Sequence, residues 1–352
     1  MSGVVSDAEG RIHTLNRTAM PALAPLARLL LRTESIASSK IEGMQVNARS
    51  LARAELREDA GARLGTETLE VLASVDAMQL AVEEASASSE LRVDDLLAIH
   101  RLLLERTKPE IAGVVRDEQN WIGGNDYNPC GADFVPPPPD EVDALLNDLI
   151  AFCNRDDLPP LVQAAVAHAQ FETIHPFRDG NGRTGRALLQ VILRRRDLAP
   201  SYVPPVSVVL AAEREAYISG LTDFRGARES EWLEKFSVAA ARAADLAASY
   251  LTKVSQLQDR WRDSLKESVA PRSDAASWAI IDVLPAFPVI SGSVGAVAIS
   301  RSRPATDQGI KQLVEAAVLL PLSDARRNRI WEAAGLLDLL DELEAARPAP
   351  VQ

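Results

Sequence analysis

Cysteine is scarce in this chain of 352 residues, which contains only Cys130 and Cys153. Two cysteines are too few for a disulfide framework and lack the paired spacing of a zinc site, so we expect a reducing compartment. The first ten residues are polar and mildly acidic, and no apolar run reaches the ~18 uncharged residues that a membrane span needs. We therefore predict a cytoplasmic protein that does not enter the membrane.

Basic residues are in the minority: 38 Lys and Arg stand against 50 Asp and Glu, for a net charge of −12. This balance argues against a protein that binds nucleic acid or a membrane surface over its whole length. A local basic patch can still lie within that total, so it has to be sought segment by segment.

Helix-forming residues dominate the chain, above all Ala, Leu, Arg and Glu. Apolar residues recur at three- and four-residue spacing in several stretches: Leu23, Leu26, Leu29 and Leu30; Leu96, Leu97, Leu102 and Leu103; Leu161, Ala165, Val166 and Ala169. We find no internal repeat of solenoid period. The pattern predicts a mainly α fold, an irregular helical bundle of about two domains at roughly 100–200 residues per domain.

Residues 119–139 break the helical pattern. Two apolar pairs, Trp121-Ile122 and Phe134-Val135, flank a stretch rich in Gly and Asn, and four prolines follow. This order favours a β-hairpin closed by the prolines, with an irregular surface loop as the alternative.

A second unit is expected near the C-terminus, because the long helical stretch that starts near residue 231 ends near 266 and residues 269–273 form a hinge. Beyond it we expect helices at 274–284, 288–298 and 302–317, and strands at 318–322 and 328–331 about a turn at 323–327. Three helices followed by a basic hairpin resemble a winged helix.

Residues 294–331 carry a local excess of positive charge, +3 in all. The basic residues are Arg301, Arg303, Lys311, Arg326, Arg327 and Arg329, and the acidic ones are Asp307, Glu315 and Asp324. The excess suits a nucleic-acid surface, but winged helices also dock proteins, so we expect contact with either DNA or a protein.

The strongest chemical signal is residues 175–186, which read H-P-F-R-D-G-N-G-R-T-G-R between predicted helices at 161–174 and 183–196. Gly180 and Gly182 let the backbone turn tightly and aim N–H groups at a ligand. The following helix presents its free N–H groups and the positive end of its dipole to the same place. The segment therefore predicts a cradle for an anion.

Charged side chains extend this cradle. Asp179 offers the carboxylate oxygen that Mg²⁺ prefers. Arg183 and Arg186 lie three residues apart on one helix face and can grip two phosphates. His175 stands at the mouth, where an imidazole can take a proton from an attacking hydroxyl. The ligand implied is a polyphosphate with bound magnesium.

The same segment contains G-x-G-x-x-G, at Gly180, Gly182 and Gly185, so a dinucleotide-binding fingerprint has to be considered. That fingerprint needs a buried strand before it and an acidic residue about twenty positions on. Here a helical pattern precedes it and the region near Pro200 is apolar and rich in proline. We therefore reject this interpretation, and also a Walker A loop, because no Gly-Lys-Ser/Thr follows.

Residues 175–186 match the signature of Fic-domain enzymes, H-x-F-x-D/E-G-N-G-R-x-x-R, at every fixed position. Residues 119–139 look like their flap, and residues 217–236 resemble the helices behind their nucleotide site, so the resemblance covers roughly residues 10–250. It implies a Fic-type helical bundle with a β-hairpin flap. We divide the chain into an N-terminal helical region (1–90), a catalytic core with flanking helices (91–267) and a winged-helix-like domain (268–352).

The resemblance also implies an activity, the transfer of AMP from Mg²⁺-bound ATP to a Tyr, Thr or Ser hydroxyl of a target protein or of the chain itself. His175 would be the general base, Asp179 would hold Mg²⁺, and Phe177 would be a core anchor. The target would dock on the flap at 119–139. The expected nucleotide-binding residues are Gly180, Asn181, Gly182, Arg183, Thr184, Gly185, Arg186 and Tyr217.

A second motif predicts regulation. Residues 38–43 read S-S-K-I-E-G and resemble the S/T-x-x-x-E-G/N inhibitory motif of one class of Fic enzymes, on a helix at about 25–43. Ser38, Glu42 and Gly43 are its fixed positions, and Glu42 would pair with Arg186. The alternative is an ordinary helix end with Glu42 in solvent and Gly43 as the cap.

The remaining histidines and Tyr217 can be explained without a catalytic role. His168 is expected to be a packing histidine, because a seven-residue spacing to His175 with no third ligand does not make a metal site. We expect His100 and His13 at the surface or in packing. Tyr217 lines the adenine pocket or belongs to the core.

Two functions follow from these features. The first is a cytoplasmic nucleotidyltransferase, a protein adenylyltransferase held inactive by Glu42 that also removes AMP if Glu42 handles a water. The alternative is a DNA-binding regulator that uses the Fic core as a nucleotide sensor, which an intact His175 disfavours. A homo-oligomer is left open.

Overall fold

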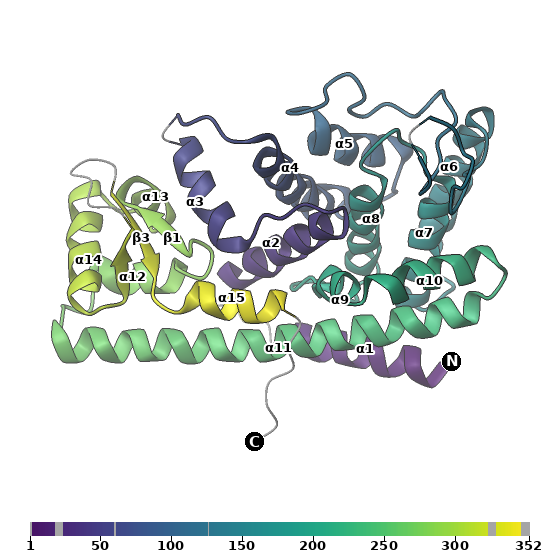
Figure 1. Cartoon of the computed structure of the whole chain (residues 1–352). Coiled ribbons are helices and arrows are strands. Elements are labelled where there is room, and N and C mark those ends of the chain that lie inside the picture. Colours follow the sequence, from purple (N-terminus) through teal and green to yellow (C-terminus); the bar gives the residue numbers. More distant parts are fainter. Residues whose placement is uncertain (1, 18–23, 60, 126, 323–328, 346–352) are drawn as a thin grey trace.

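The computed structural model describes the chain except for residues 1, 18–23, 60, 126, 323–328 and 346–352. The described part is mainly helical, as the composition predicts (Figure 1). The N-terminal and central elements are α1 Ser2–Arg17, α2 Ala24–Ile41, α3 Ala48–Asp59, α4 Thr66–Leu80 with a π-helical turn at Ala81–Ala85, α5 Val93–Leu104, α6 Pro139–Cys153, α7 Pro160–Ile174, α8 Asn181–Arg195, α9 Val206–Ala212 and α10 Arg214–Arg225. The remaining elements are α11 Glu229–Ser268, α12 Ala276–Val283, β1 Val289–Ser291, α13 Gly292–Ala298, α14 Arg303–Glu315, β2 Leu319–Pro321, β3 Ile330–Ala333 and α15 Leu336–Glu344.

Helix α8 is the centre of the bundle. Nearly all its residues from Asn181 to Leu193 are buried, including the apolar run Ala187, Leu188, Leu189, Val191, Ile192 and Leu193. Because almost every residue of this stretch is buried, other elements have to surround it, and α2, α5 and α7 pack around it. The turn between α7 and α8 therefore has both of its flanking helices fixed in the core.

Helix α11 spans 40 residues and extends along one side of the molecule, about 60 Å at 1.5 Å per residue (Figure 1). Its buried face includes Trp232, Phe236, Tyr250, Leu257 and Trp261. The first half packs on α1 and α10, and the second half packs on α15 and α12. This helix thus joins the bundle to the C-terminal elements. No helix in the described part of the chain is long and apolar enough to cross a membrane.

In its described residues, the C-terminal unit consists of four helices, α12 to α15, and a three-stranded antiparallel sheet with strand order β1-β3-β2. Ile290 pairs with Trp331 in β3, and Leu320 of β2 pairs with Glu332. The prediction of one helix at 288–298 is wrong, because Val289 and Ile290 pair with β3 and the Ser291 side chain caps a helix that begins only at Gly292. The predicted turn at 323–327 and Asn328 lie outside the described residues. Helix α15 was not predicted from the sequence. The assignment of the unit as a winged helix stays a prediction.

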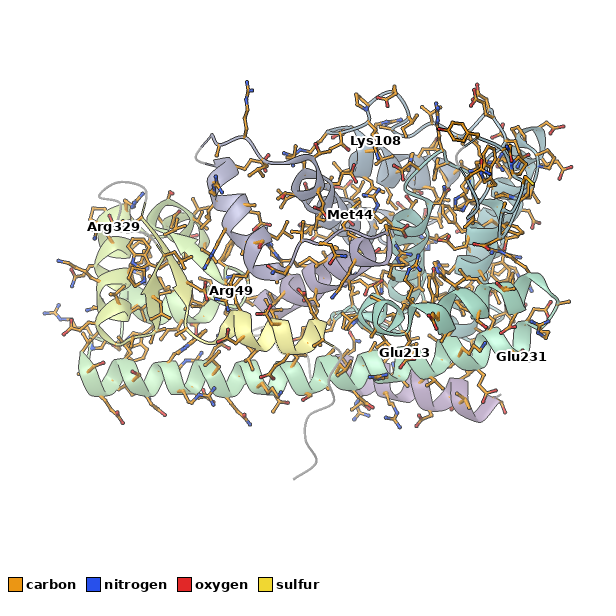
Figure 2. The ribbon with its side chains drawn as sticks, viewed as in Figure 1. Met44, Arg49, Lys108, Glu213, Glu231 and Arg329 are labelled. Atoms are coloured by element: carbon orange, nitrogen blue, oxygen red, sulfur yellow. The ribbon has the colours of Figure 1, made fainter. Side chains whose placement is uncertain are left out.

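The C-terminal unit packs closely on the rest of the chain. Arg49 of α3, labelled in Figure 2, pairs with Glu332 of β3 at 2.6 Å and with Asp338 of α15 at 2.6 Å. The Trp261 indole N–H donates to the carbonyl of Ala334 at 3.2 Å. A cut near residue 262 would expose buried side chains such as Leu257, so the division into separable domains stays a prediction.

The hairpin predicted at 119–139 is reduced to one antiparallel bridge, between Ile122 and Phe134. Its described residues form no strand of two or more paired positions. Three glycines in the segment, Gly123, Gly124 and Gly131, have positive φ, a conformation that interrupts a strand. The predicted antiparallel pairing of the two apolar pairs is therefore present at this one bridge, and the rest of the described segment matches the irregular-loop alternative.

Candidate functional site

The turn between α7 and α8 is held in one conformation. His175 ends α7 with φ 50° and ψ 59°, and Gly180 begins the next helix at φ 77°. The Asn181 side chain brackets the turn, since its Oδ1 accepts from the Phe177 N–H (2.8 Å) and its Nδ2 donates to the Phe177 carbonyl (2.7 Å). Phe177 is fully buried, as predicted. The N–H groups at the start of α8 thus have a fixed direction.

His100 is buried, which matches the packing alternative predicted for it, and it also supports the turn. Its ring stacks on Phe177 with 3.7 Å between the centroids. Nδ1 accepts from the Gly113 N–H (2.9 Å), so Nε2 carries the proton that it donates to the Asp179 carbonyl (2.9 Å). Burial lowers the pKa of His100 to about 4, which keeps the ring neutral. Nothing in the local sequence around His100 signals this role.

His175 lies at the mouth of the turn. Its carbonyl accepts from Arg116 Nε (2.9 Å) and from Asn120 Nδ2 (3.4 Å), which fixes the backbone. Burial, with the positive charge of Arg225, lowers the pKa of His175 to about 4. The imidazole is therefore neutral near pH 7 and has a lone pair free to accept a proton.

Asp179 is surrounded by positive charge. Its carboxylate pairs with Lys108 Nζ at 2.6 Å and accepts from the Gly180 N–H at 2.6 Å, while Arg183 lies 3.8 Å away. Burial works to raise the pKa of Asp179, but Lys108 and Arg183 outweigh it and hold that pKa below its ordinary value. The sequence did not indicate Lys108, which Figure 2 labels, or Glu70, which lies 3.4 Å from the same ammonium.

The side chains around Asp179 fit a magnesium ion only if phosphate oxygens supply its other ligands. No group of three or more His, Cys, Asp or Glu side chains that could hold a metal occurs in the described residues. A partly exposed single carboxylate, Asp179, is what Mg²⁺ uses when the nucleotide's phosphates supply further oxygens. Lys108 would then have to leave the carboxylate.

The two arginines of the cradle pair with different carboxylates. Buried Arg183 lies 3.6 Å from Glu70 and 3.8 Å from Asp179. Arg186 is 1% exposed and donates from Nη2 to Glu42 Oε1 (2.6 Å) and the Ser38 carbonyl (2.8 Å), and from Nε to Ser38 Oγ (2.8 Å). Burial opposes its charge, but Glu42 raises the pKa of Arg186 further above its ordinary value. The predicted contact between Glu42 and Arg186 is present.

Helices α2 and α8 pack antiparallel, with one pair of facing residues per helical turn. Glu34 faces Gln190, Ser38 faces Arg186, and Glu42 faces Gly182. A Cβ on Gly182 would collide with the Glu42 carboxylate, so a larger residue there would push this side chain aside. Glu42 therefore lies against the first turn of α8, where an anion is most favoured.

The first of these facing pairs contains a buried carboxylate, that of Glu34, which the sequence did not indicate. Glu34 is 1% exposed and accepts from the Ser207 N–H (2.8 Å), Ser207 Oγ (2.6 Å) and Gln190 Nε2 (3.2 Å). Burial raises its pKa. Three hydrogen bonds from α8 and α9 thus fix the position of α2 along α8, and with it the position of Glu42.

Other predicted site residues have packing contacts. Gly43 has φ 92° and ends α2, and its N–H donates to the Lys40 carbonyl (3.0 Å). Thr184 is fully buried, and a Cβ on Gly185 would press on Phe171 and Glu172, so Gly185 allows α7 and α8 to approach. Their nucleotide-binding roles stay predictions.

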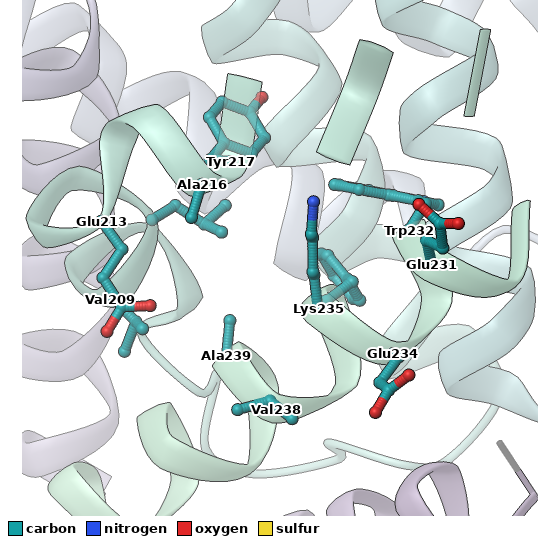
Figure 3. A pocket seen from close by; sticks show the side chains of 12 residues that line it. Val209, Glu213, Ala216, Tyr217, Glu231, Trp232, Glu234, Lys235, Val238 and Ala239 are labelled. Carbon is teal, nitrogen blue, oxygen red and sulfur yellow. The ribbon is translucent and has the colours of Figure 1, made fainter. Parts of the chain in front are cut away.

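Tyr217 is buried, and its hydroxyl lies 2.9 Å from Nε2 of His168, which is the packing histidine predicted. On the other side its ring lines a pocket of about 400 Å³ among α9, α10 and α11, with Trp232 and Lys235 (Figure 3). These contacts match the core alternative for Tyr217, and its adenine role stays a prediction. Neighbouring Glu172 was missed; burial raises its pKa to about 7.

The flap is tied to the site at its base. Arg225 of α10 stacks on Phe134 with 3.9 Å from its guanidinium carbon to the ring centroid, and it donates to the Glu172 carbonyl (3.0 Å). Asn120 donates to the Phe177 carbonyl (3.0 Å). The exposed edge beside Ile122 and Phe134 thus borders the mouth where His175 lies.

The predicted basic surface at 294–331 is described only in part. Arg301, Arg303, Lys311 and Arg329 are exposed, and Arg303 pairs with Asp307 at 2.9 Å. Arg326, Arg327 and Asp324 lie outside the described residues. Contact with DNA or protein through this segment stays a prediction.

The fold and site together define a helical protein in which a carboxylate of the N-terminal region, Glu42, lies against the first turn of the central helix and pairs with Arg186. Residues 90–193 match the family model described as Fic/DOC family, and residues 5–83 match the model described as Fic/DOC family N-terminal. The two matches cover more than half of the chain. The chain belongs to the Fic/DOC family.

Curated relatives are similar over the central region. The protein adenylyltransferase fic-1 of Caenorhabditis elegans is 35% identical over 133 residues, which is 37% of this chain and 23% of that protein. The protein adenylyltransferase Fic of Drosophila willistoni is 34% identical over 134 residues, 36% of this chain and 25% of that protein. The chain thus covers about a quarter of the length of these relatives.

Solved structures share the fold. A Fic family protein from Desulfovibrio desulfuricans superposes with a TM-score of 0.56 at 23% identity, over 94% of this chain and 96% of the other. Fic-1 from C. elegans gives a TM-score of 0.56 at 22% identity, over 70% and 71%. The mainly helical Fic-type fold is confirmed.

Proposed function

We propose that the chain is a protein adenylyltransferase that transfers AMP from ATP to a hydroxyl of a target protein and is held inactive by Glu42. One observation carries the proposal: a neutral His175 at the mouth of an anion cradle whose second arginine, Arg186, is bonded to Glu42. The names of the curated relatives support the reaction class.

In this reaction the target's hydroxyl oxygen attacks the α-phosphorus of ATP. His175 takes the hydroxyl proton, the bond from the α-phosphorus to the bridging oxygen breaks, and pyrophosphate leaves with that electron pair. The N–H groups at the start of α8 and Asn181 would face the α-phosphate, and Arg183 and Arg186 the β- and γ-phosphates. Asp179 would hold a Mg²⁺ ion, which neutralises phosphate charge when bound.

Inhibition follows from the same contacts. While Glu42 holds Nη2 of Arg186, that guanidinium lacks a free donor pair for the γ-phosphate. The Glu42 carboxylate also occupies the start of α8 and repels an incoming phosphate. ATP then binds in a posture unsuited to in-line attack.

The target would lie along the flap. The described flap has a single bridge, so an extended segment can add backbone hydrogen bonds beside Ile122 and Phe134. This position brings a Tyr, Thr or Ser hydroxyl toward His175, and the chain's own hydroxyls are further targets. Removal of AMP, with Glu42 handling the water, is the second activity the site supports.

Labelled ATP distinguishes the enzyme from a DNA-binding regulator that only senses nucleotide. The Glu42→Gly variant should incorporate label into protein from ATP labelled at the α-phosphate and none from ATP labelled at the γ-phosphate. Label from the γ-phosphate would indicate a kinase, and no label from either would favour the sensor.

Replacing Glu34 by Ala should release inhibition in part, because α2 loses three hydrogen bonds that fix the position of Glu42 along α8. We expect a rise of about tenfold in adenylylation, corresponding to weakening of a buried contact by ~1.4 kcal/mol. The rate of label incorporation measures it.

The double variant Glu34→Ala with Glu42→Gly separates positioning from stability. It should match Glu42→Gly alone, since Glu34 acts only through Glu42. If Glu34→Ala lowers activity in both backgrounds, Glu34 serves the fold and not inhibition.

A further inference from the structure

The flap at residues 119–139 has two sides, and side-chain contacts tie each of them to the core. On the first side, Asn120 Nδ2 donates to a carbonyl of the turn between α7 and α8 (3.0 Å). On the second side, Phe134 lies against the guanidinium of Arg225, the last residue of α10. The Ile122 N–H donates to the Phe134 carbonyl (2.9 Å) and so joins the two sides. The bridge of the flap therefore has an anchor on each side.

The contact between Arg225 and Phe134 suits an arginine. The guanidinium carbon lies 3.9 Å from the ring centroid, inside the ~6 Å over which the face of an aromatic ring attracts a cation. A flat guanidinium can stack on a ring and still donate from its edge, whereas an ammonium has no flat face. Here Nη2 donates to the carbonyl of Glu172 (3.0 Å), in the last turn of α7. Arg225 therefore joins the flap, the end of α7 and α10.

The end of α7 also carries the proposed base. His175 follows Glu172 by three residues and ends the helix. Burial is the main cause of the low pKa of His175, about 4, and the positive charge of Arg225 is the next cause. Glu42 acts to raise this pKa, and Arg116 acts to lower it. The guanidinium of Arg225 is thus close enough to influence the base as well as the flap.

We propose that Arg225 is a positioning residue that holds the Phe134 side of the flap against the end of α7, so that a hydroxyl docked on the flap lies at His175. This inference rests on the proposed adenylyl transfer and adds a residue outside the signature at 175–186. Reaction needs the reacting atoms about 3–3.5 Å apart, and a flap released from α7 no longer keeps the hydroxyl there. Arg225 has no part in holding the phosphates, so ATP binding does not depend on it.

The test uses the full chain in the Glu42→Gly background and measures two quantities, the incorporation of label into the chain from α-labelled ATP and the Kd for ATP. Arg225→Gln should lower the labelling rate at saturating ATP about tenfold and leave the Kd unchanged. Arg228→Gln is the matched control, because Arg228 is half exposed and pairs with Asp223 and Glu231 instead of the flap. It should behave as its parent.

A double-mutant cycle with Phe134→Leu separates positioning from stability. Phe134→Leu alone should slow labelling by a similar factor. The double variant Arg225→Gln with Phe134→Leu should be no slower than either single variant, because both substitutions remove the same contact. Two effects that multiply would overturn the proposal, since Arg225 would then act independently of the flap.

Amide hydrogen exchange tests the same contact without any labelling reaction. The Ile122 N–H should exchange about tenfold faster in Arg225→Gln than in its parent. Unchanged exchange would overturn the proposal, whatever the labelling rate. If Arg225→Gln does not fold, Phe134→Leu, which changes a partly exposed side chain, decides by the same measurement. If the parent takes up no label, the proposed self-modification fails, and exchange at Ile122 still decides the role of Arg225.

Discussion

Replacing His175 by Ala in the Glu42→Gly background should abolish adenylylation while leaving ATP binding nearly intact. The imidazole acts on the incoming hydroxyl, and its pKa of about 4 keeps it neutral and able to accept the proton near pH 7. Loss of a general base typically costs ~10²–10⁴-fold in rate. The rate of label transfer from α-labelled ATP and the Kd for ATP measure the two effects separately.

His13→Ala is the control for this substitution, because His13 is exposed on α1 and away from the turn. It should keep the activity of its parent. A His175→Ala protein that retains more than half of the parent rate would exclude His175 as the base.

The second large effect is expected at Glu42, where Glu42→Gly should raise adenylylation by roughly 10- to 100-fold. A hydrogen bond to a charged group contributes about 1.5–3 kcal/mol, and each 1.4 kcal/mol is a factor of ten. The substitution frees Nη2 of Arg186 and removes the carboxylate from the start of α8. Initial rates at saturating Mg²⁺-ATP measure the gain.

Glu58→Gly provides a matched comparison. Glu58 also pairs with an arginine near a helix end and has a similar side-chain exposure, 36% against 37% for Glu42. It should leave the rate unchanged. Glu42→Gly combined with Arg186→Ala should be inactive, since the freed guanidinium is then missing. No gain from Glu42→Gly alone would mean that Glu42 is an ordinary residue of a helix end.

The sequence predicted those parts of the site whose residues are neighbours in the chain. Residues 175–186 supply the turn, the glycines and both arginines within twelve positions, and Ser38 and Glu42 share one helix face. Four supporting side chains were not predicted: Glu34, Glu70, His100 and Lys108. They reach the site from separate helices and a loop, and their partners are set only when these pack around α8.

The differences between the predicted and the observed fold have a similar cause. Strand β1 is three residues long and exists because Val289 and Ile290 pair with β3, more than forty residues later. The flap sequence has apolar pairs at both ends, but the positive φ of Gly123, Gly124 and Gly131 breaks the ladder between them. Long helices such as α11 were predicted well because their apolar period repeats over many turns.

Intact-protein mass spectrometry after incubation of the Glu42→Gly protein with ATP tests the central claim most directly. We predict that the chain, or a protein in an added lysate, gains the mass of one AMP group. Fragmentation should map this group to a Tyr, Thr or Ser oxygen. The gain should be much smaller for the unsubstituted chain and absent for Glu42→Gly with His175→Ala. A gain of phosphate alone, or no gain from Glu42→Gly, would contradict the account.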